Sequence, residues 1–276
     1  MFQPENPAAS GDPLVEVAIS VAFGPIKGLN QAHLGVFWKE LRETYPFVHS
    51  AQPLMQPYEE FGKKGSWLPP SIQLQLTHEP ALRLQMTSEN DEWMCQTQLD
   101  RIVVNWRRRG GEYPRFHETW ARFSESWVAW LNFLDSMSIQ RPSPVGWELA
   151  YVNRVFNDER PAGPQDWPSM FPGLWGSRIA AIDGCELVGL RGQWVWDCTE
   201  SAARLYIEAK PGKFGNPLRE ALLLTLTARG PIDDFDADSQ GSADSSIAVI
   251  KRGVDSGHAL VLGAFDRITE NDTAKR

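Results

Sequence analysis

The sequence predicts an α+β fold made of two similar antiparallel sheet-plus-helix halves, arranged in tandem and facing each other. Two observations support this prediction. Apolar residues alternate in many short segments, which is typical of strands with one buried face, and residues 115–137 and 246–268 each place apolar side chains on one stripe of a helix. The Pro-Ser-Pro sequence at 142–144 divides the chain into a first half, 14–141, and a second half, 142–276, and each half ends in one of these helices.

The first half follows a Pro/Ala/Ser/Gly-rich segment, residues 1–13, which we expect to be a flexible N-terminus. Residues 14–23 have β-branched side chains at alternate positions, which predicts a strand. The Gly-Pro pair that follows is expected to end this strand. Asn30 is a favoured N-cap residue and precedes apolar residues at helical spacing, so a helix is expected before Pro46. Further strands are predicted at 71–78, 81–87, 91–98 and 100–107, as an antiparallel meander.

The second half repeats this order. A predicted strand at 145–156 is followed by a Pro/Gly/Trp-rich excursion at 160–177. Further strands are predicted at 184–190, 192–198, 202–210 and 220–229, with a hairpin connection at 210–217. An acidic loop at 232–244 leads to the last helix. Because no repeat is detectable residue by residue, the predicted likeness between the halves is one of topology.

Composition and charge limit the class of protein. The net charge is −8, and the halves share it equally, with 12 basic and 16 acidic residues in 1–138 and 15 and 19 in the remainder. Neither half is therefore a basic nucleic-acid-binding module. The three cysteines have no metal-like spacing and are predicted to be free thiols of a reducing cytosol. Without signal-peptide features or a span of ~18 apolar residues, the chain is expected to be soluble and cytoplasmic.

The segment 99–116 is the most informative part of the chain for function. A predicted strand ends in Trp106 and runs into three arginines, a Gly-Gly turn and a Tyr-Pro pair. Arginine stacks on aromatic rings and forks onto carboxylates or phosphates, so this edge is a candidate site for a planar or anionic partner. The predicted binding residues are Trp106, Arg107, Arg108, Arg109, Tyr113 and Arg115. In the alternative interpretation, Trp106 lies in the core and the arginines pair with Glu112, Glu118 or acids of the other half.

A second group of residues lies at the start of the second half. Glu148, Tyr151 and Asn153 belong to the strand predicted at 145–156, in which Glu148 faces opposite to the other two side chains. Asn153 could hydrogen-bond across a seam between the halves. We therefore expect these three residues to have a structural role at that seam.

No motif predicts a catalytic or metal site. The Asp-rich segment 233–238 departs from the calcium-loop pattern where that pattern requires Gly and Glu. His258 in the last helix lies near Asp255 and Asp266, and a hydrogen-bonded packing histidine is favoured over an acid–base pair. Nucleotide-binding glycine patterns and serine-hydrolase motifs are absent. We therefore predict no catalytic residue, no metal and no cofactor.

Four segments resemble a sporadically distributed bacterial family of unassigned function. They are PLVEVAISVAFGPIKGL with the AHLGVFWKELRETYP that follows it, DRIVVNWRRRGGEYPRF, ELAYVNRV at 148–155, and VDSGHALVLGAFDRIT at 254–269. NWRRR…YPRF and ELAYVN are the most specific of these. Family members often continue past the final helix to a Trp-containing segment, whereas this chain ends in ENDTAKR. The resemblance implies no catalytic residues, and the family's patchy distribution is like that of accessory or defence-type genes.

The function expected from these observations is a non-catalytic cytoplasmic subunit that binds a protein partner or senses a ligand. A place in a bacterial defence or toxin–antitoxin type system is one expectation for this subunit, and homo-oligomerisation stays open. One alternative is a nucleic-acid-binding or nucleic-acid-processing protein that uses the Arg/Trp edge. The other is an enzyme that acts on a small molecule in a cleft between the halves.

Overall fold

The computed structural model describes residues 13–55, 61, 82–156, 164–176, 182–185, 187–198, 202–214, 217–232 and 243–269. The strands are β1 (Leu14–Phe23), β2 (Phe47–Ala51), β3 (Arg83–Thr87), β4 (Trp93–Gln98), β5 (Arg101–Arg107), β6 (Pro144–Phe156), β7 (Gly192–Cys198), β8 (Ala203–Phe214) and β9 (Arg219–Pro231). The helices are α1 (Gln31–Leu41), α2 (Phe116–Ser136), α3 (Trp167–Met170), α4 (Pro172–Trp175) and α5 (Ala243–Thr269).

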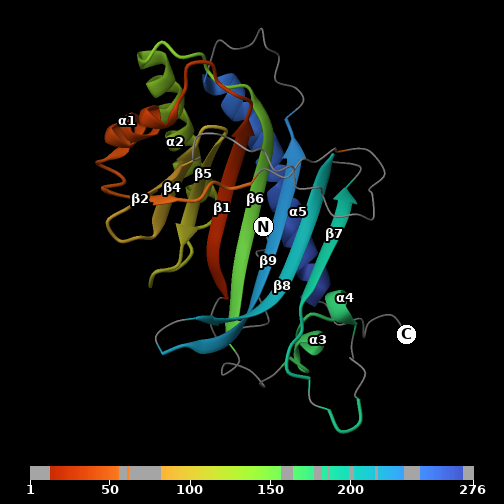
Figure 1. Cartoon of the computed structure of the whole chain (residues 1–276). Coiled ribbons are helices and arrows are strands. Elements are labelled where there is room, and N and C mark those ends of the chain that lie inside the picture. The colour runs from red at the N-terminus through yellow and green to blue at the C-terminus, as the bar shows by residue number, and fades with distance from the viewer. Residues whose placement is uncertain are drawn as a thin grey trace.

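The described strands form one continuous antiparallel sheet in the order β2-β3-β4-β5-β1-β6-β9-β8-β7. Helices α1, α2 and α5 lie side by side on one face of it: α2 packs on β5 and β1, and α5 packs on β6 and β9 (Figure 1). The α+β class is therefore confirmed. None of the helices within the described ranges is long and apolar enough to cross a membrane.

The prediction that two halves face each other is wrong in its geometry. Strands β1 and β6 pair directly, with Ile19 opposite Leu149 and Ala22 opposite Gly146, so the strands of both halves lie in the same sheet. The alternation of side chains fixes which face of a strand is buried, but it does not specify which strands pair. The described strands consequently form no cleft between two facing sheets.

Most predicted elements are found close to their expected ends. The Asn30 side chain caps α1 by accepting a hydrogen bond from the backbone N–H of Ala32. Strand β2 was not predicted, no strand forms in the described part of 184–190, and β8 continues to Phe214 through the segment predicted as a hairpin connection. The strand predicted at 71–78, nearly all of the N-terminal segment and most of the acidic loop lie outside the described residues. The three cysteines are free thiols, as predicted.

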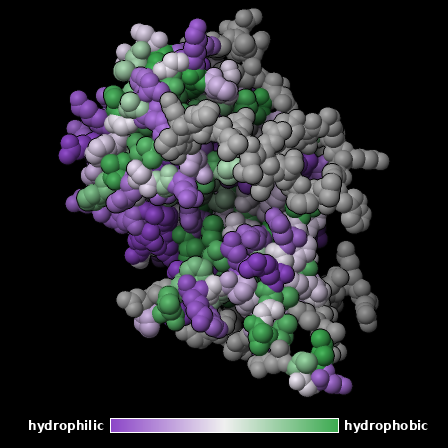
Figure 2. Space-filling view, viewed as in Figure 1, coloured by the Kyte–Doolittle hydropathy of each residue, from purple (hydrophilic) through white to green (hydrophobic). Residues whose placement is uncertain are grey.

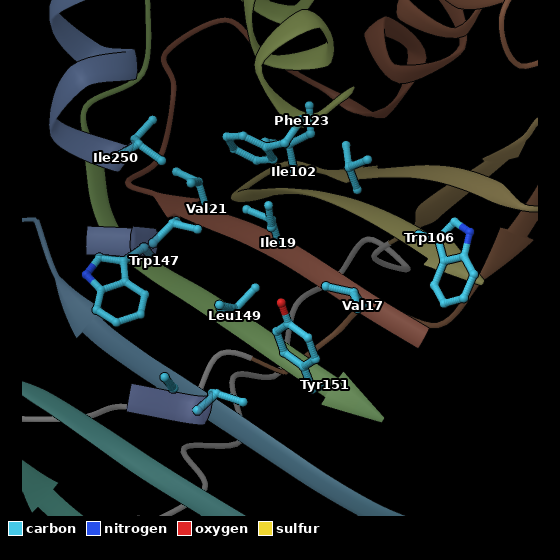
Figure 3. Close-up of a cluster of buried hydrophobic side chains, with 14 of the residues drawn as sticks. Val17, Ile19, Val21, Ile102, Trp106, Phe123, Trp147, Leu149, Tyr151 and Ile250 are labelled. Atoms are coloured by element: carbon cyan, nitrogen blue, oxygen red, sulfur yellow. The ribbon is translucent and has the colours of Figure 1, made fainter. Parts of the chain in front are cut away.

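Under α2 the core is aromatic because the helix supplies the large side chains. Phe123, Trp127 and Trp130 are all fully buried. The ring of Phe23, at the end of β1, lies 6.1 Å from the ring of Trp130, and Phe37 of α1 meets Trp130 edge-on at 4.9 Å. Aliphatic side chains of β1 and β5 complete this layer (Figure 3).

Under α5 the arrangement is reversed, because the strand supplies the large side chain and the helix supplies space. Trp147 of β6 is 5% exposed and packs against Gly253 and Gly257 of α5 and Gly230 of β9. A Cβ atom at Gly257 would lie 2.4 Å from the Trp147 ring, and one at Gly253 would lie equally close. The two glycines therefore let α5 approach the sheet closely over β6 and β9.

Candidate functional site

The predicted arginine edge is divided between the two faces of the sheet. Trp106 lies opposite Val17 of β1 and points toward the helices, where it is 1% exposed (Figure 3). Arg107 is the next residue of β5 and therefore points to the other face, because neighbouring side chains of a strand point in opposite directions. The strand cannot present this ring and this guanidinium on one face.

The three arginines bind groups of the chain itself. Arg107 and Arg109 both form ion pairs with Asp91, which lies in the β3–β4 turn with φ at 57°. Arg108 donates its Nε–H to the backbone oxygen of Leu14 at 2.7 Å and lies 5.6 Å from the centre of the Trp106 ring. These contacts connect the end of β5 to β1 and to the β3–β4 turn. The acidic partner is thus Asp91 and not Glu112 or Glu118.

Tyr113 and Tyr151 meet beside α5, although they belong to different predicted groups. The Tyr113 hydroxyl lies 3.4 Å from the Tyr151 hydroxyl, which lies 2.9 Å from Nδ1 of His258. The His258 ring stacks on Phe116 at 3.9 Å. Burial lowers the pKa of His258 and raises the pKa of Tyr151, so both groups are neutral at pH 7. This hydrogen-bonded neutral ring has the contacts expected of a packing histidine.

The other predicted residues lie apart from this cluster. Arg115 is exposed and precedes α2 with φ at 82°. Glu148 lies on the sheet face without helices and pairs with Arg229 of β9. Asn153 lies on the helix-covered face, 6% exposed, opposite Leu14, beside a register shift in the β1–β6 pairing. The seam between the predicted halves is therefore a pair of hydrogen-bonded strands.

The sheet face opposite the helices, here called the open face, bears polar side chains, and hydrophilic residues gather over its first-half strands (Figure 2). Gln96 accepts hydrogen bonds from Arg83 at 2.8 Å and Gln85 at 3.1 Å, and donates to Asn105 at 2.7 Å. Asn105 in turn donates to Glu16 at 2.5 Å. Burial raises the pKa of Glu16. This polar chain crosses four strands, and sequence reasoning missed it because its members are far apart in the chain.

Strand β7 forms one edge of the sheet and exposes apolar side chains. Val195 is 50% exposed on the open face, and Trp196 is 41% exposed on the opposite face. Helix α5 packs on β6 and β9 and reaches β8, which leaves Trp196 at the margin of the helical layer. Among the described residues, the backbone of β7 forms hydrogen bonds with β8 and with no other strand. The feature of the sequence that indicates this apolar edge is the run Trp-Val-Trp in the strand predicted at 192–198.

No group of three or more His, Cys, Asp or Glu within the described ranges could hold a metal ion, and the Asp-rich segment 233–238 falls outside those ranges. No model of a known protein family matches the chain, and no curated protein matches its sequence. The family suggested by the four sequence segments therefore stays a prediction.

Proposed function

We propose that this protein is a non-catalytic partner-binding subunit of the accessory or defence type, and that its partner adds a β-strand to the outer edge of β7. The observation that supports this proposal is the edge of β7, which exposes apolar side chains and pairs with no second strand among the described residues. Edge strands in soluble proteins are commonly protected by charge, proline, a bulge or a covering segment, because their free N–H and C=O groups pair readily with other chains.

The side chains of β7 favour a protein over other partners. An added strand takes its affinity from main-chain hydrogen bonds and its specificity from side chains on alternate faces. Val195 and Trp196 offer one apolar contact on each face of the sheet. Aromatic residues are enriched in protein interfaces, and a tryptophan is a frequent source of binding energy there.

Nucleic-acid binding through the arginine edge would compete with contacts inside the chain. Arg107 and Arg109 are paired with Asp91, and Arg108 is bonded to the Leu14 backbone. A phosphate backbone would have to displace these partners. The protein-partner proposal needs no such rearrangement.

The test replaces exposed apolar side chains of β7 by charges. The tagged full chain is used to capture proteins from its native host, beside a Val195→Lys/Trp196→Lys variant and a control variant with Phe47→Lys/Ser50→Lys on β2, the opposite edge. We expect one protein to be captured by the wild type and the β2 control and lost from the β7 variant. Hydrogen exchange should then show slower exchange of β7 amides in the complex. Capture that is equal for all three proteins would contradict the proposal.

The same experiment separates the other possible partners. A species of twice 31.1 kDa in solution, absent from the β7 variant, would identify a second copy of the chain as the partner. Captured RNA or DNA that the β7 variant retains, and that is lost when Arg107–Arg109 are replaced by Ala, would overturn the proposal in favour of the arginine edge.

The prediction of two related halves also stays a proposal, and connectivity supports it. Outward from the centre of the sheet, the strands run β1-β5-β4-β3-β2 on one side and β6-β9-β8-β7 on the other. In each half the first strand is central, the last strand returns beside it, and a long helix follows. Superposing residues 144–269 on 14–136 tests this: β6, β9, β8 and β7 should fall on β1, β5, β4 and β3.

A further inference from the structure

Two arginines on the open face lie in one row of the sheet, far from β7. Arg101 of β5 is opposite Ala22 of β1 and Gln98 of β4. Arg83 of β3 follows in the same row, because its neighbour Leu84 is opposite Thr97. Two strand spacings separate the two arginines, so their Cα atoms are about 10 Å apart. Both side chains point to the face that has no helices.

Among the described residues, neither arginine has a carboxylate partner. Arg101 is 6% exposed, yet among the described residues no hydrogen-bond acceptor or acidic group meets its guanidinium, and its Nε is buried without a partner. Arg83 donates one hydrogen bond, to Gln96, and its Nε is also buried without a partner. Burial lowers the pKa of Arg83, which reflects the cost of keeping this charge away from water.

The acidic groups on nearby strands have other partners. Glu16 accepts a hydrogen bond from Asn105, and Asp100 accepts one from Gln98 at 2.6 Å. Ser20, diagonal to Arg101 on β1, is 3% exposed, and its hydroxyl is buried without a partner. Burying a charge without a partner is costly, and buried hydroxyls are nearly always hydrogen-bonded. Two arginines without a carboxylate partner therefore lie in this row, and one hydroxyl without a partner lies diagonal to it, as far as the described residues show.

The geometry points to a binding site for a phosphoryl group that Arg101 and Arg83 reach from either side of Gln98, whose own side chain is bonded to the Leu54 backbone, with Ser20 as a further donor. A phosphoryl dianion neutralises both guanidinium groups, whereas one carboxylate would leave a positive charge uncompensated. Its several oxygens can also accept hydrogen bonds from donors on different strands, and guanidinium groups bind phosphate through paired N–H donors. This site is independent of the partner edge at β7.

The test uses the full chain at pH 7.5, where phosphoryl groups are mostly dianionic. Sodium phosphate, glycerol 3-phosphate and sodium acetate are titrated at constant ionic strength, and binding is followed by calorimetry and by the melting temperature. The variants are Arg101→Met and Arg83→Met. The matched control is Arg204→Met on the same face, because Arg204 already pairs with Asp197.

We expect a phosphoryl ligand, and not acetate, to bind the wild type and the Arg204→Met control and to raise their melting temperatures. Each of the other two variants should weaken this binding at least tenfold. Without ligand, Arg101→Met should melt no lower than the wild type, because it removes an unpaired buried charge. Binding of both phosphates identifies the phosphoryl group itself as the ligand, and binding of glycerol 3-phosphate alone identifies a phosphate ester.

Two results would overturn the inference. One is that neither phosphate binds better than acetate. The other is that Arg101→Met and Arg83→Met bind phosphate as tightly as the wild type does. A ligand-free Arg101→Met protein that melts well below the wild type, with no phosphate effect on either, would assign Arg101 a purely structural role. None of these results bears on strand addition at β7.

Discussion

The two faces of the sheet both bury side chains but are stabilised by different interactions. On the helix-covered face the buried groups are aromatic and aliphatic, and Trp106, Trp127 and Trp130 are at most 1% exposed. On the open face the buried groups include polar ones, and Gln96 and Arg101 are at most 6% exposed. The covered face therefore depends on volume and shape, whereas the open face depends on hydrogen bonds and on the balance of charge.

The two faces therefore differ in what a substitution is expected to change. Packed apolar groups satisfy one another on the covered face, although Thr97, Thr119 and Trp130 each bury one polar atom there without a partner among the described residues. Polar groups need a partner for each donor and acceptor, and on the open face some donors have none among the described residues. Substitutions of packed apolar side chains on the covered face should mainly change stability, whereas substitutions of titratable or charged side chains should change pH or ligand dependence.

The largest expected effect is on the covered face. Trp127→Ala removes a fully buried ring, and its Nε1–H no longer donates to Ser246 of α5, a hydrogen bond of 3.0 Å. Truncation of a large core aromatic costs about 3–5 kcal/mol of unfolding free energy. Trp196→Ala, which truncates a 41% exposed ring, is the control. Urea denaturation measures both, and a loss below about 1 kcal/mol for Trp127→Ala would show that packing does not dominate this face.

The second prediction tests the space that α5 leaves for Trp147. Gly257→Ala places a methyl group 2.4 Å from the buried ring, and we expect a loss of about 1–3 kcal/mol. Gly263→Ala in the same helix meets no atom within 4 Å and should instead stabilise by about 0.5–1 kcal/mol, because alanine favours helix. Thermal unfolding of the pair gives the comparison. Changes of the same sign would contradict a close approach of α5 at Gly257.

A smaller effect, on the pH dependence of stability, is expected from His258 on the covered face. Its pKa is lowered by burial, so the unfolded chain binds a proton more readily than the folded chain. Stability should therefore fall as the pH falls below about 6.5, until the folded-state pKa is passed. His258→Gln keeps a hydrogen-bonding group for Tyr151 and should remove this part of the pH dependence. Denaturation at pH 7.5 and 5.5 tests it, and equal slopes for both proteins would refute the assignment.

The smallest expected effect is on the open face, where stability should rise and not fall as the pH is lowered. The pKa of Glu16 is raised by burial, so its ionised form lowers stability at neutral pH, and this penalty fades as the pH falls toward 4.5. Glu16→Gln retains an acceptor for Asn105 and should stabilise the protein at pH 7 but not at pH 4. Stabilisation that persists unchanged at pH 4 would mean that charge is not the cause.

Local features of the sequence were predicted where neighbouring residues determine them. Asn30 caps α1, and the stripe of Trp120, Phe123, Trp127 and Trp130 faces inward or partly inward on α2. Strand β2 was missed because its five residues, Phe-Val-His-Ser-Ala, show no clear alternation. Apolar residues at 187–190 suggested a strand where none forms, because a β-pattern alone does not supply a pairing partner.

The candidate sites were harder to predict because the residues that contact one another in them are distant in the chain. Asp91, which binds two arginines of the predicted edge, precedes them by 16 and 18 positions. Tyr151 and His258 are 107 positions apart and meet only because α5 crosses β6. Arg83 and Arg101 become neighbours of one row only through the register of β3, β4 and β5.

The sequence by itself determined the periodicity of most elements, and with it the side chains that face the core, because a side chain's direction follows from the backbone repeat of its own helix or strand. The tertiary structure decided that β1 pairs with β6, that both halves share one sheet, and that polar side chains such as Arg101 and Gln96 are buried. The physical reason is that strand pairing uses backbone groups common to all residues. Many pairings are therefore chemically equivalent, and only the packing of the whole chain selects one.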